Sequence, residues 1–192
     1  YVKEMISVND LTDSALVDNL IHNRLNFRWY PSENLRMYGA LRTRLFIGET
    51  TELLADDFVD FIEYDTYFFD LSWTVYNEGS YMLHTLIDRL YLEWIHKDMT
   101  LKVGRQRINW GINTVWNPND IFNAYSYFDF DYEERPGTDA IRLEYYTGTN
   151  SSIDVAVSLP AETLGPDERK INTLSAALMY KTNQWDYDFQ FL

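Results

Sequence analysis

Alternation of apolar and polar side chains with a period of two is the feature that most constrains this chain. From residue 24 to residue 30 the apolar positions are Leu25, Phe27 and Trp29, and polar side chains fill the positions between them. Successive side chains of a β-strand point to opposite faces, so this spacing predicts a strand with one apolar face. The pattern recurs in the segments 1–8, 35–45, 90–94, 100–103, 141–145, 153–159, 172–180 and 185–191.

These segments predict an all-β fold of about nine antiparallel strands. Helical periodicity is not convincing anywhere, although residues 11–20 could hold a short helix. Short turn-forming stretches occur at 31–34, 97–98, 147–150 and 182–184, whereas long connections occupy 9–19, 48–80, 110–137 and 160–170. In an up-and-down sheet the short turns then share one rim and the long connections the other. Residues 67–76 also alternate, and we assign them to an extracellular hairpin or extension.

The composition narrows the class of protein. The 192 residues include 16 Lys and Arg against 30 Asp and Glu, a net charge of −14, which argues against nucleic acid as the main partner. An aromatic content of 17% is too high for a disordered acidic tail. No stretch approaches the ~18 uncharged apolar residues of a membrane-spanning helix. The absence of cysteine removes disulfides and thiolate metal sites.

Alternation by itself fits either a soluble β-sandwich or a membrane barrel, because it does not say which face is buried. Three features favour an antiparallel up-and-down transmembrane β-barrel with short periplasmic turns and long extracellular loops. The strands have about ten residues, enough to cross a bilayer at a tilt. Loop lengths are one-sided, and aromatic residues lie near strand ends, as in interfacial girdles. These aromatic residues are Trp29, Tyr30, Trp94, Tyr145, Trp185 and Tyr187.

Strand number predicts that the barrel is incomplete. Bacterial single-chain barrels close with an even number of strands, whereas nine are counted here. We therefore expect residues 1–192 to form a single barrel domain that is the N-terminal portion of a longer protein, with long loops at 48–80 and 110–137.

A block in the second half of the chain resembles porin-like Gram-negative outer-membrane barrel proteins. It comprises VGRQRINWG at 103–111, VWNPNDIF at 115–122 and EERPGTDA at 133–140. In that family a strand ending in Gly-Arg-Gln runs into a Trp-Gly turn and a Trp-x-Pro-x-Asp loop. The resemblance implies a barrel of more strands, a place in the bacterial outer membrane, and lipid and lipopolysaccharide as surroundings. It transfers no catalytic residue and no particular solute.

Gly104 interrupts the alternation inside this block. Without a bulge there, Arg105 and Arg107 would share the lipid side of Val103, at about 2–4 kcal/mol each near the bilayer midplane. A bulge at Gly104 or a position at the rim, where the arginines could snorkel to the headgroups, would relieve this.

The polar face carries the candidate functional residues. We predict that it lines the lumen with Arg24, Arg28, Arg36, Arg42, Arg44, Arg89, Glu93, Arg142 and Glu144. Arginine dominates the first strands, and a basic wall would concentrate anionic solutes. The alternative is that Arg42, Arg89, Glu93 and Glu144 pair across strands and brace the barrel.

The connection 110–137 is too long for a passive link. It could fold inward as a constriction, with its acidic side chains facing the arginine wall and its aromatic rings offering flat surfaces to sugars or other amphipathic solutes. Alternatively, it could form an extracellular cap packed on its own aromatics. The constriction candidates are Trp110, Trp116, Asp129, Asp131, Glu133 and Glu134.

Enzymatic readings are weak, so we expect no catalytic activity, cofactor or metal. The three histidines, His22, His84 and His96, lack ligand spacing, and no nucleophile-elbow motif occurs. Acidic clusters at 56–60 and 129–133 do not match a calcium loop. The leading interpretation is a porin-like channel for small solutes, with a preference for anions or sugars. The alternatives are a non-conducting accessory barrel of a larger outer-membrane complex and a soluble carbohydrate-binding β-sandwich. Other outer-membrane proteins or further copies of this chain could be partners.

Overall fold

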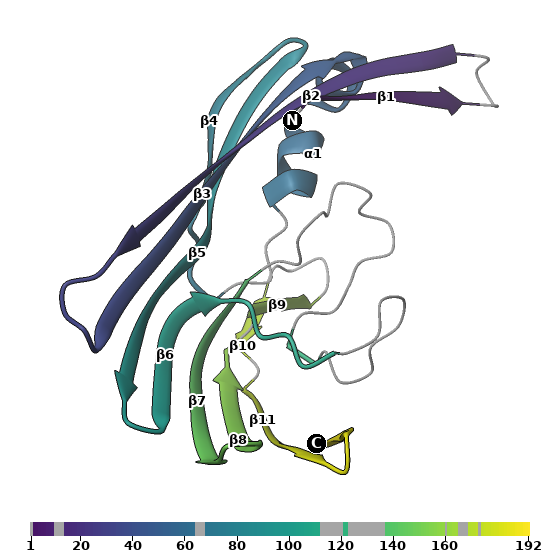
Figure 1. Cartoon of the computed structure of the whole chain (residues 1–192). Helices are drawn as coiled ribbons and strands as arrows, with labels where there is room; N and C mark the ends of the chain where they lie inside the picture. The colour runs from purple at the N-terminus through teal and green to yellow at the C-terminus, as the bar shows by residue number, and fades with distance from the viewer. Residues whose placement is uncertain are drawn as a thin grey trace. The chain divides into compact units, whose positions relative to one another are not determined.

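An antiparallel β-sheet accounts for most of the chain. The computed structural model describes residues 2–9, 14–63, 68–111, 121–122, 137–159, 161–164, 169–172 and 174–192. The elements are β1 (Val2–Asn9), β2 (Ser14–Trp29), β3 (Leu35–Gly48), α1 (Glu49–Glu63), β4 (Ser72–Glu78), β5 (Tyr81–His96), β6 (Met99–Gln106), β7 (Thr138–Gly148), β8 (Ser151–Ser158), β9 (Ala161–Leu164), β10 (Arg169–Asn172), β11 (Ser175–Gln184) and β12 (Tyr187–Phe191) (Figure 1). The all-β prediction is therefore confirmed.

The strands are ordered as an open sheet. The main path is β1-β2-β3-β5-β6-β7-β8-β11-β12, while β4 pairs with β5 beside it and β9 and β10 form a separate two-stranded sheet. Among the described residues β1 and β12 each pair with one neighbour. Nearly every strand on the path is adjacent to its neighbour in sequence, as an up-and-down arrangement requires.

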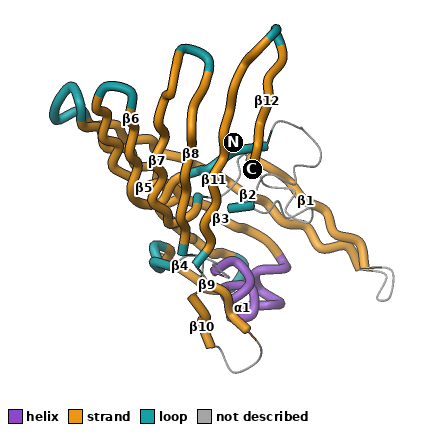
Figure 2. The backbone as a smooth tube through the Cα atoms, turned by 90° about the horizontal axis from the view of Figure 1, so that it is seen from below, coloured by secondary structure: helices purple, strands orange, loops and turns teal. Residues whose placement is uncertain are grey.

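Short turns join every second pair of strands on this path. They connect β2 to β3, β5 to β6, β7 to β8 and β11 to β12. Figures 1 and 2 show the last three of these turns at the same edge of the sheet. Lys97 at φ 51° makes the two-residue β5–β6 turn, and Trp185 and Asp186 at φ 55° and 64° make the last one. The turn predicted at 182–184 is thus wrong by a few residues, because those residues pair within β11.

The first connection is shorter than the sequence suggests. Asn9 pairs with Ser14, so β2 begins there and only residues 10–13, which lie outside the described part of the chain, separate the two strands. The predicted connection at 9–19 is wrong, and residues 14–20 are strand rather than helix. Hydrogen bonding between β1 and β2 outweighs the local residue pattern of this segment, which is also compatible with a helix.

Helix α1 is the main departure from the prediction that no convincing helix exists. Phe58, Val59 and Ile62 are spaced by three and four residues, which places them on one side of a helix. Glu49 and Glu52 lie in its first turn, where carboxylates complement the helix dipole. The helix begins where Gly48 ends β3, and its apolar side covers part of the sheet.

The alternating segment near residue 70 forms a short strand instead of a spanning one. β4 pairs with β5 through the register Ser72↔Leu86 to Glu78↔Tyr81, with an irregularity between Thr74 and Tyr76. It has 7 residues and lies off the main path, as predicted for a hairpin extension.

Gly104, between Val103 and Arg105, has an unusual backbone conformation but causes no shift in strand register. The β5–β6 pairing runs continuously from Leu90↔Arg105 to His96↔Met99, so the expected bulge is not found. Gly104 instead has φ 119°, a conformation open to glycine and strained for other residues. Val103 remains exposed whereas Arg105 is buried. The burial of Arg105, which pairs with Asp139, thus coincides with an unusual backbone conformation and not with an extra residue.

The residues cluster into two compact units. The first comprises Tyr1–Asn26, Ala40–Asp65 and Asp70–Ile87, and its buried core is Leu20, Phe46 and Met82. The second comprises Phe27–Gly39, Thr66–Phe69 and Asp88–Leu192, and its buried core is Ile108, Trp110, Ala140, Ala156 and Met179. Both cores are small, and much of the apolar surface lies elsewhere.

Replacement of Gly104 by Ala should destabilise the sheet. A Cβ atom at residue 104 would lie 2.3 Å from the carbonyl oxygen of Leu90, and the φ value adds strain. We expect a loss of about 1–3 kcal/mol in the free energy of unfolding, measured by urea titration of tryptophan fluorescence. Gly39→Ala is the matched control, because its Cβ would meet nothing closer than 3.8 Å. Equal stability of the two variants would contradict the assigned backbone.

Candidate functional site

The sheet distributes its side chains in the opposite way to a water-soluble sheet. Leu25, Phe27 and Trp29 are exposed by 61%, 57% and 54% of their surfaces. Charged and ionisable side chains, by contrast, make up much of the buried set: Arg42, His84, Asp88, Arg89, Glu93, Arg105, Asp139 and Asp154. A soluble antiparallel sheet buries its apolar face and hydrates the charged one. The buried charged surface is therefore the candidate functional site.

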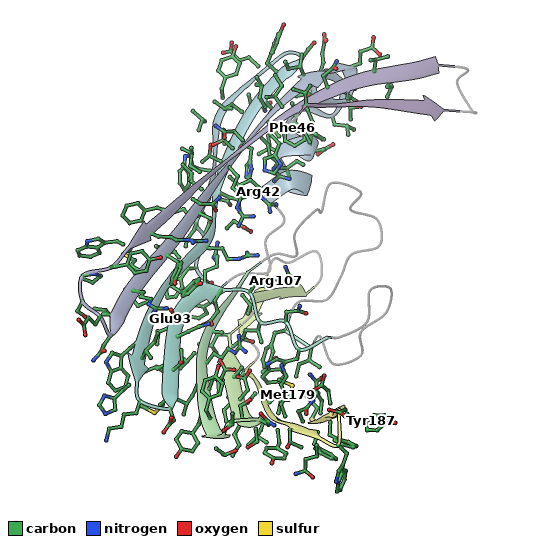
Figure 3. The ribbon with its side chains drawn as sticks, in the orientation of Figure 1. Arg42, Phe46, Glu93, Arg107, Met179 and Tyr187 are labelled. Carbon is green, nitrogen blue, oxygen red and sulfur yellow. The ribbon has the colours of Figure 1, made fainter. Side chains whose placement is uncertain are left out.

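Within the first unit, arginines and a histidine lie on one face of β3 and β5. Arg42, Arg44 and Phe46 occupy alternate positions of β3, and Figure 3 shows Arg42 and Phe46 on the side where α1 lies. Nη2 of Arg44 is 3.3 Å from Nδ1 of His84, which is fully buried. Because a guanidinium can only donate, Nδ1 accepts this hydrogen bond. The arrangement places positive charge beside a neutral ring.

In the second unit, Glu93 connects three strands. Its carboxylate lies 3.2 Å from Nζ of Lys102 on β6 and 3.5 Å from Nη1 of Arg36 on β3. The hydroxyl of Tyr38 donates to the same carboxylate at 3.4 Å, and the Tyr38 ring stacks on Tyr91 with centroids 4.9 Å apart. Glu93 and Lys102 are directly opposite in the ladder, so the register itself creates the pair.

A second cluster in this unit is centred on Asp154. Nε of Arg142 lies 3.0 Å from both carboxylate oxygens of Asp154, and the indole Nε1 of Trp110 donates to Oδ2 at 2.8 Å. Trp110 also packs edge-on against Phe122 and within the core that includes Met179. Figure 3 labels Met179 beside β8 and β11. The start of the 110–137 connection is thus fixed to the polar side of β7 and β8.

The third cluster joins Arg105 to Asp139, which are opposite each other in β6 and β7. The pair is bidentate, with Nε at 3.0 Å from Oδ1 and Nη2 at 3.1 Å from Oδ2. The backbone N–H of Phe69 donates to Asp139 at 2.9 Å, and its carbonyl accepts from Arg105. A distant segment of chain therefore completes the coordination of a buried ion pair.

The remaining lumen candidates occupy different surroundings. Arg89 pairs with the adjacent Asp88 at 3.0 Å. Arg24 and Glu144 are half-buried. Arg28 is exposed, with its guanidinium carbon 5.9 Å from the ring centroid of Tyr38. Of the residues that the bracing alternative named, Glu93 pairs across strands with Arg36 and Lys102, and Arg89 pairs with Asp88.

Of the constriction candidates, Trp110 is described and is buried against the sheet. The other candidates, Trp116, Asp129, Asp131, Glu133 and Glu134, lie outside the described residues. Sequence reasoning missed Lys102 and Asp139 as partners of buried charges. Lys102 could have been found by aligning the predicted strands across the turn at residues 97–98, since it lies directly opposite Glu93. Asp139 could not be found in this way, because a long connection joins β6 to β7.

Among the residues that the structure describes, no group of three or more histidine and acidic side chains is placed to hold a metal ion. No helix in the same part of the chain has the length and apolar character needed to cross a membrane. No family model, curated protein or solved structure matches the chain.

Asp154→Asn should weaken the second cluster. The change leaves Arg142 partly buried without its counter-charge, so we expect a loss of about 3 kcal/mol in the free energy of unfolding, measured by urea titration. Trp110→Phe removes a neutral donor to the same carboxylate and also shrinks a buried ring, so it should lose about 2 kcal/mol.

The control for this pair is Asp186→Asn, the same chemical change in the exposed β11–β12 turn. It should leave stability unchanged. If Asp154→Asn behaved like this control, the Asp154 cluster would not stabilise the fold.

Proposed function

We propose that this chain forms wall strands of a transmembrane β-barrel in a bacterial outer membrane and that the barrel is a porin-like channel for passive diffusion of small solutes. The observation that most directly supports this proposal is the distribution of side chains, which is the reverse of that in a water-soluble sheet: charged groups are buried on the sheet and apolar groups are exposed. In a membrane barrel the apolar face contacts lipid and the polar face lines the interior.

Energetics favour lipid over water as the surroundings of the apolar face. Transfer of one large apolar side chain out of water stabilises a protein by about 1.5–3 kcal/mol. Leu25, Phe27, Leu92, Ile141 and Leu178 are all exposed, so each would forgo this gain in water. A β-sandwich would cover this face with a second sheet, whereas a bilayer covers it with acyl chains.

Strand length and aromatic placement agree with the same proposal. β2 and β5 have 16 residues each, more than the ~9–11 that a tilted strand needs to cross a bilayer. Trp29 and Tyr30 at one short turn and Trp94 near the next are exposed, as expected for rings at the lipid headgroups. Lipid and lipopolysaccharide are the partners that this surface fits.

The open edges imply how the barrel is completed. Backbone groups left unpaired in lipid cost several kcal/mol each. We propose that β1 and β12 are paired in the membrane by further strands, from the same protein or from another copy.

The interior chemistry supports a preference for anions. Arg42 and Arg44 occupy alternate positions of β3, which places two guanidinium groups on one face. Each of the acidic partners in the clusters is already engaged by a cation, as Glu93 is by Arg36 and Lys102. A non-conducting accessory barrel would use the same pairs solely for bracing, and conductance separates the two.

A charge on the apolar face should impair membrane stability. Leu25→Arg places a guanidinium against lipid, and we expect a loss of about 2–4 kcal/mol if residue 25 lies near the midplane. The measurement is urea unfolding of protein folded into phospholipid vesicles. Leu25→Phe keeps the face apolar and should be neutral. Full solubility of the wild-type protein without detergent would refute the membrane proposal.

Planar-bilayer recordings test the channel itself. We expect discrete conductance and, in a KCl gradient, a reversal potential that shows anion preference. Arg36→Gln should reduce this preference, because the Arg36 side chain is 39% exposed and contributes to the field of the charged face. Lys97→Gln, the same loss of charge in a turn, is the control. Absence of conductance at any salt concentration would favour the accessory barrel.

A further inference from the structure

Helix α1 lies on the charged face of the sheet and not on the apolar one. Its apolar residues Phe58, Val59 and Ile62 pack against Leu20, Phe46 and Met82. The rings of Phe46 and Phe58 meet edge-on, with centroids 5.3 Å apart. The guanidinium carbon of Arg44 lies 5.5 Å from the Phe46 ring centroid, and Arg44 contacts His84. The helix therefore shares its face with the arginines.

We infer from this packing that α1 is a fixed constriction inside the proposed channel. The inference rests on the proposed function, because the charged face is the lumen only if the sheet is a barrel wall. Leu20, Phe46 and Met82 form an apolar patch on an otherwise polar surface. An apolar patch left open to water in a lumen would be unfavourable, so another element should cover it. Helix α1 is that element.

The N-terminal end of α1 is held against the sheet by one side chain from β2 and one from the β4–β5 turn. Asp18 of β2 accepts hydrogen bonds from the Thr50 backbone N–H at 3.1 Å and from the Thr50 hydroxyl at 2.6 Å. A carboxylate from a different strand thus acts as the helix cap. Glu52 accepts from the Ser80 hydroxyl at 2.7 Å. These contacts hold the start of α1 against the sheet, so we treat the helix as a fixed element and not as a movable lid.

Gly48 allows this close approach at the junction of β3 and α1. A Cβ atom at residue 48 would lie 2.1 Å from Oδ1 of Asp18. The backbone N–H of Gly48 also donates to the carbonyl of Ser80 at 2.9 Å. The chain is therefore held against the sheet where it turns into the helix.

The side of α1 that faces away from the sheet is acidic and partly apolar. The helix contains six carboxylates and no basic residue, and Glu52, Leu53, Leu54 and Asp57 are exposed. In a channel this surface would both narrow the passage and oppose the arginines of β3 with negative charge. We expect α1 to limit the size of the solutes that pass and to reduce the preference for small anions.

Single-cysteine modification tests the placement, because the chain has no native cysteine. Leu53→Cys puts a thiol on the exposed side of α1, where Leu53 is 68% exposed. Modification by a methanethiosulfonate that carries a quaternary ammonium group should lower the single-channel conductance and shift the reversal potential toward anions. Leu25→Cys, on the apolar face, is the control and should conduct unchanged after the same treatment.

Leu54→Cys serves as a second variant in case Leu53→Cys does not fold, which heat-modifiable gel mobility reports. Mass spectrometry establishes whether each thiol has reacted. A reacted thiol with unchanged conductance, or a thiol in a conducting channel that does not react from either side, would overturn the α1 assignment and leave the channel proposal standing. A wild-type protein that never conducts would overturn both.

Discussion

Pairing of charges on a buried sheet face is the constraint on which the rest of this structure depends. An ionised group removed from water is costly unless a counter-charge and hydrogen bonds replace its hydration. Glu93, Asp139 and Asp154 each meet this requirement through an arginine or lysine on a neighbouring strand. Cross-strand register creates two of these pairs directly. A slip of one residue in the strand register would place the same charges on the apolar face. The ion pairs therefore favour the observed register, and that register in turn brings the paired charges together.

Irregular positions of the backbone allow the charged face to receive other elements. Gly104 changes the backbone where Arg105 becomes buried, and Gly48 lets Asp18 approach the start of α1. The backbone of Phe69 closes the Arg105–Asp139 pair from a segment that is far away in sequence. Polar contacts thus position the helix and the long connections, while apolar contacts on the same face are confined to small patches. The apolar residues outside those patches are left to the opposite face, which supports the proposed membrane environment.

Much of the sheet could be predicted because strand alternation and turn chemistry are local signals. The turn at Lys97 and Asp98 is where the sequence placed it, and the exposure of Leu25, Phe27 and Trp29 agrees with an outward apolar face. Helix α1 was missed although Phe58, Val59 and Ile62, which pack on the sheet, have a helical spacing. Its local cap is absent from the sequence, since the capping carboxylate comes from Asp18, more than thirty residues earlier. The expected bulge at Gly104 is not found in the ladder: the residue instead has a positive φ, and the neighbouring Arg105 is compensated by Asp139.

The sequence by itself determined most of the strands, where most of them turn, and which of their side chains share a face. All three follow from periodicity over a few neighbouring positions. Tertiary structure decided which face is buried, which charges meet and where the helix rests. Those outcomes depend on pairing between segments far apart in the chain: Glu93 reaches Arg36 on another strand, Trp110 reaches Asp154, and the apolar side of α1 reaches Leu20. Periodicity among neighbouring residues cannot predict such contacts. Their free energy arises only when distant strands have paired and excluded water from the space between their side chains.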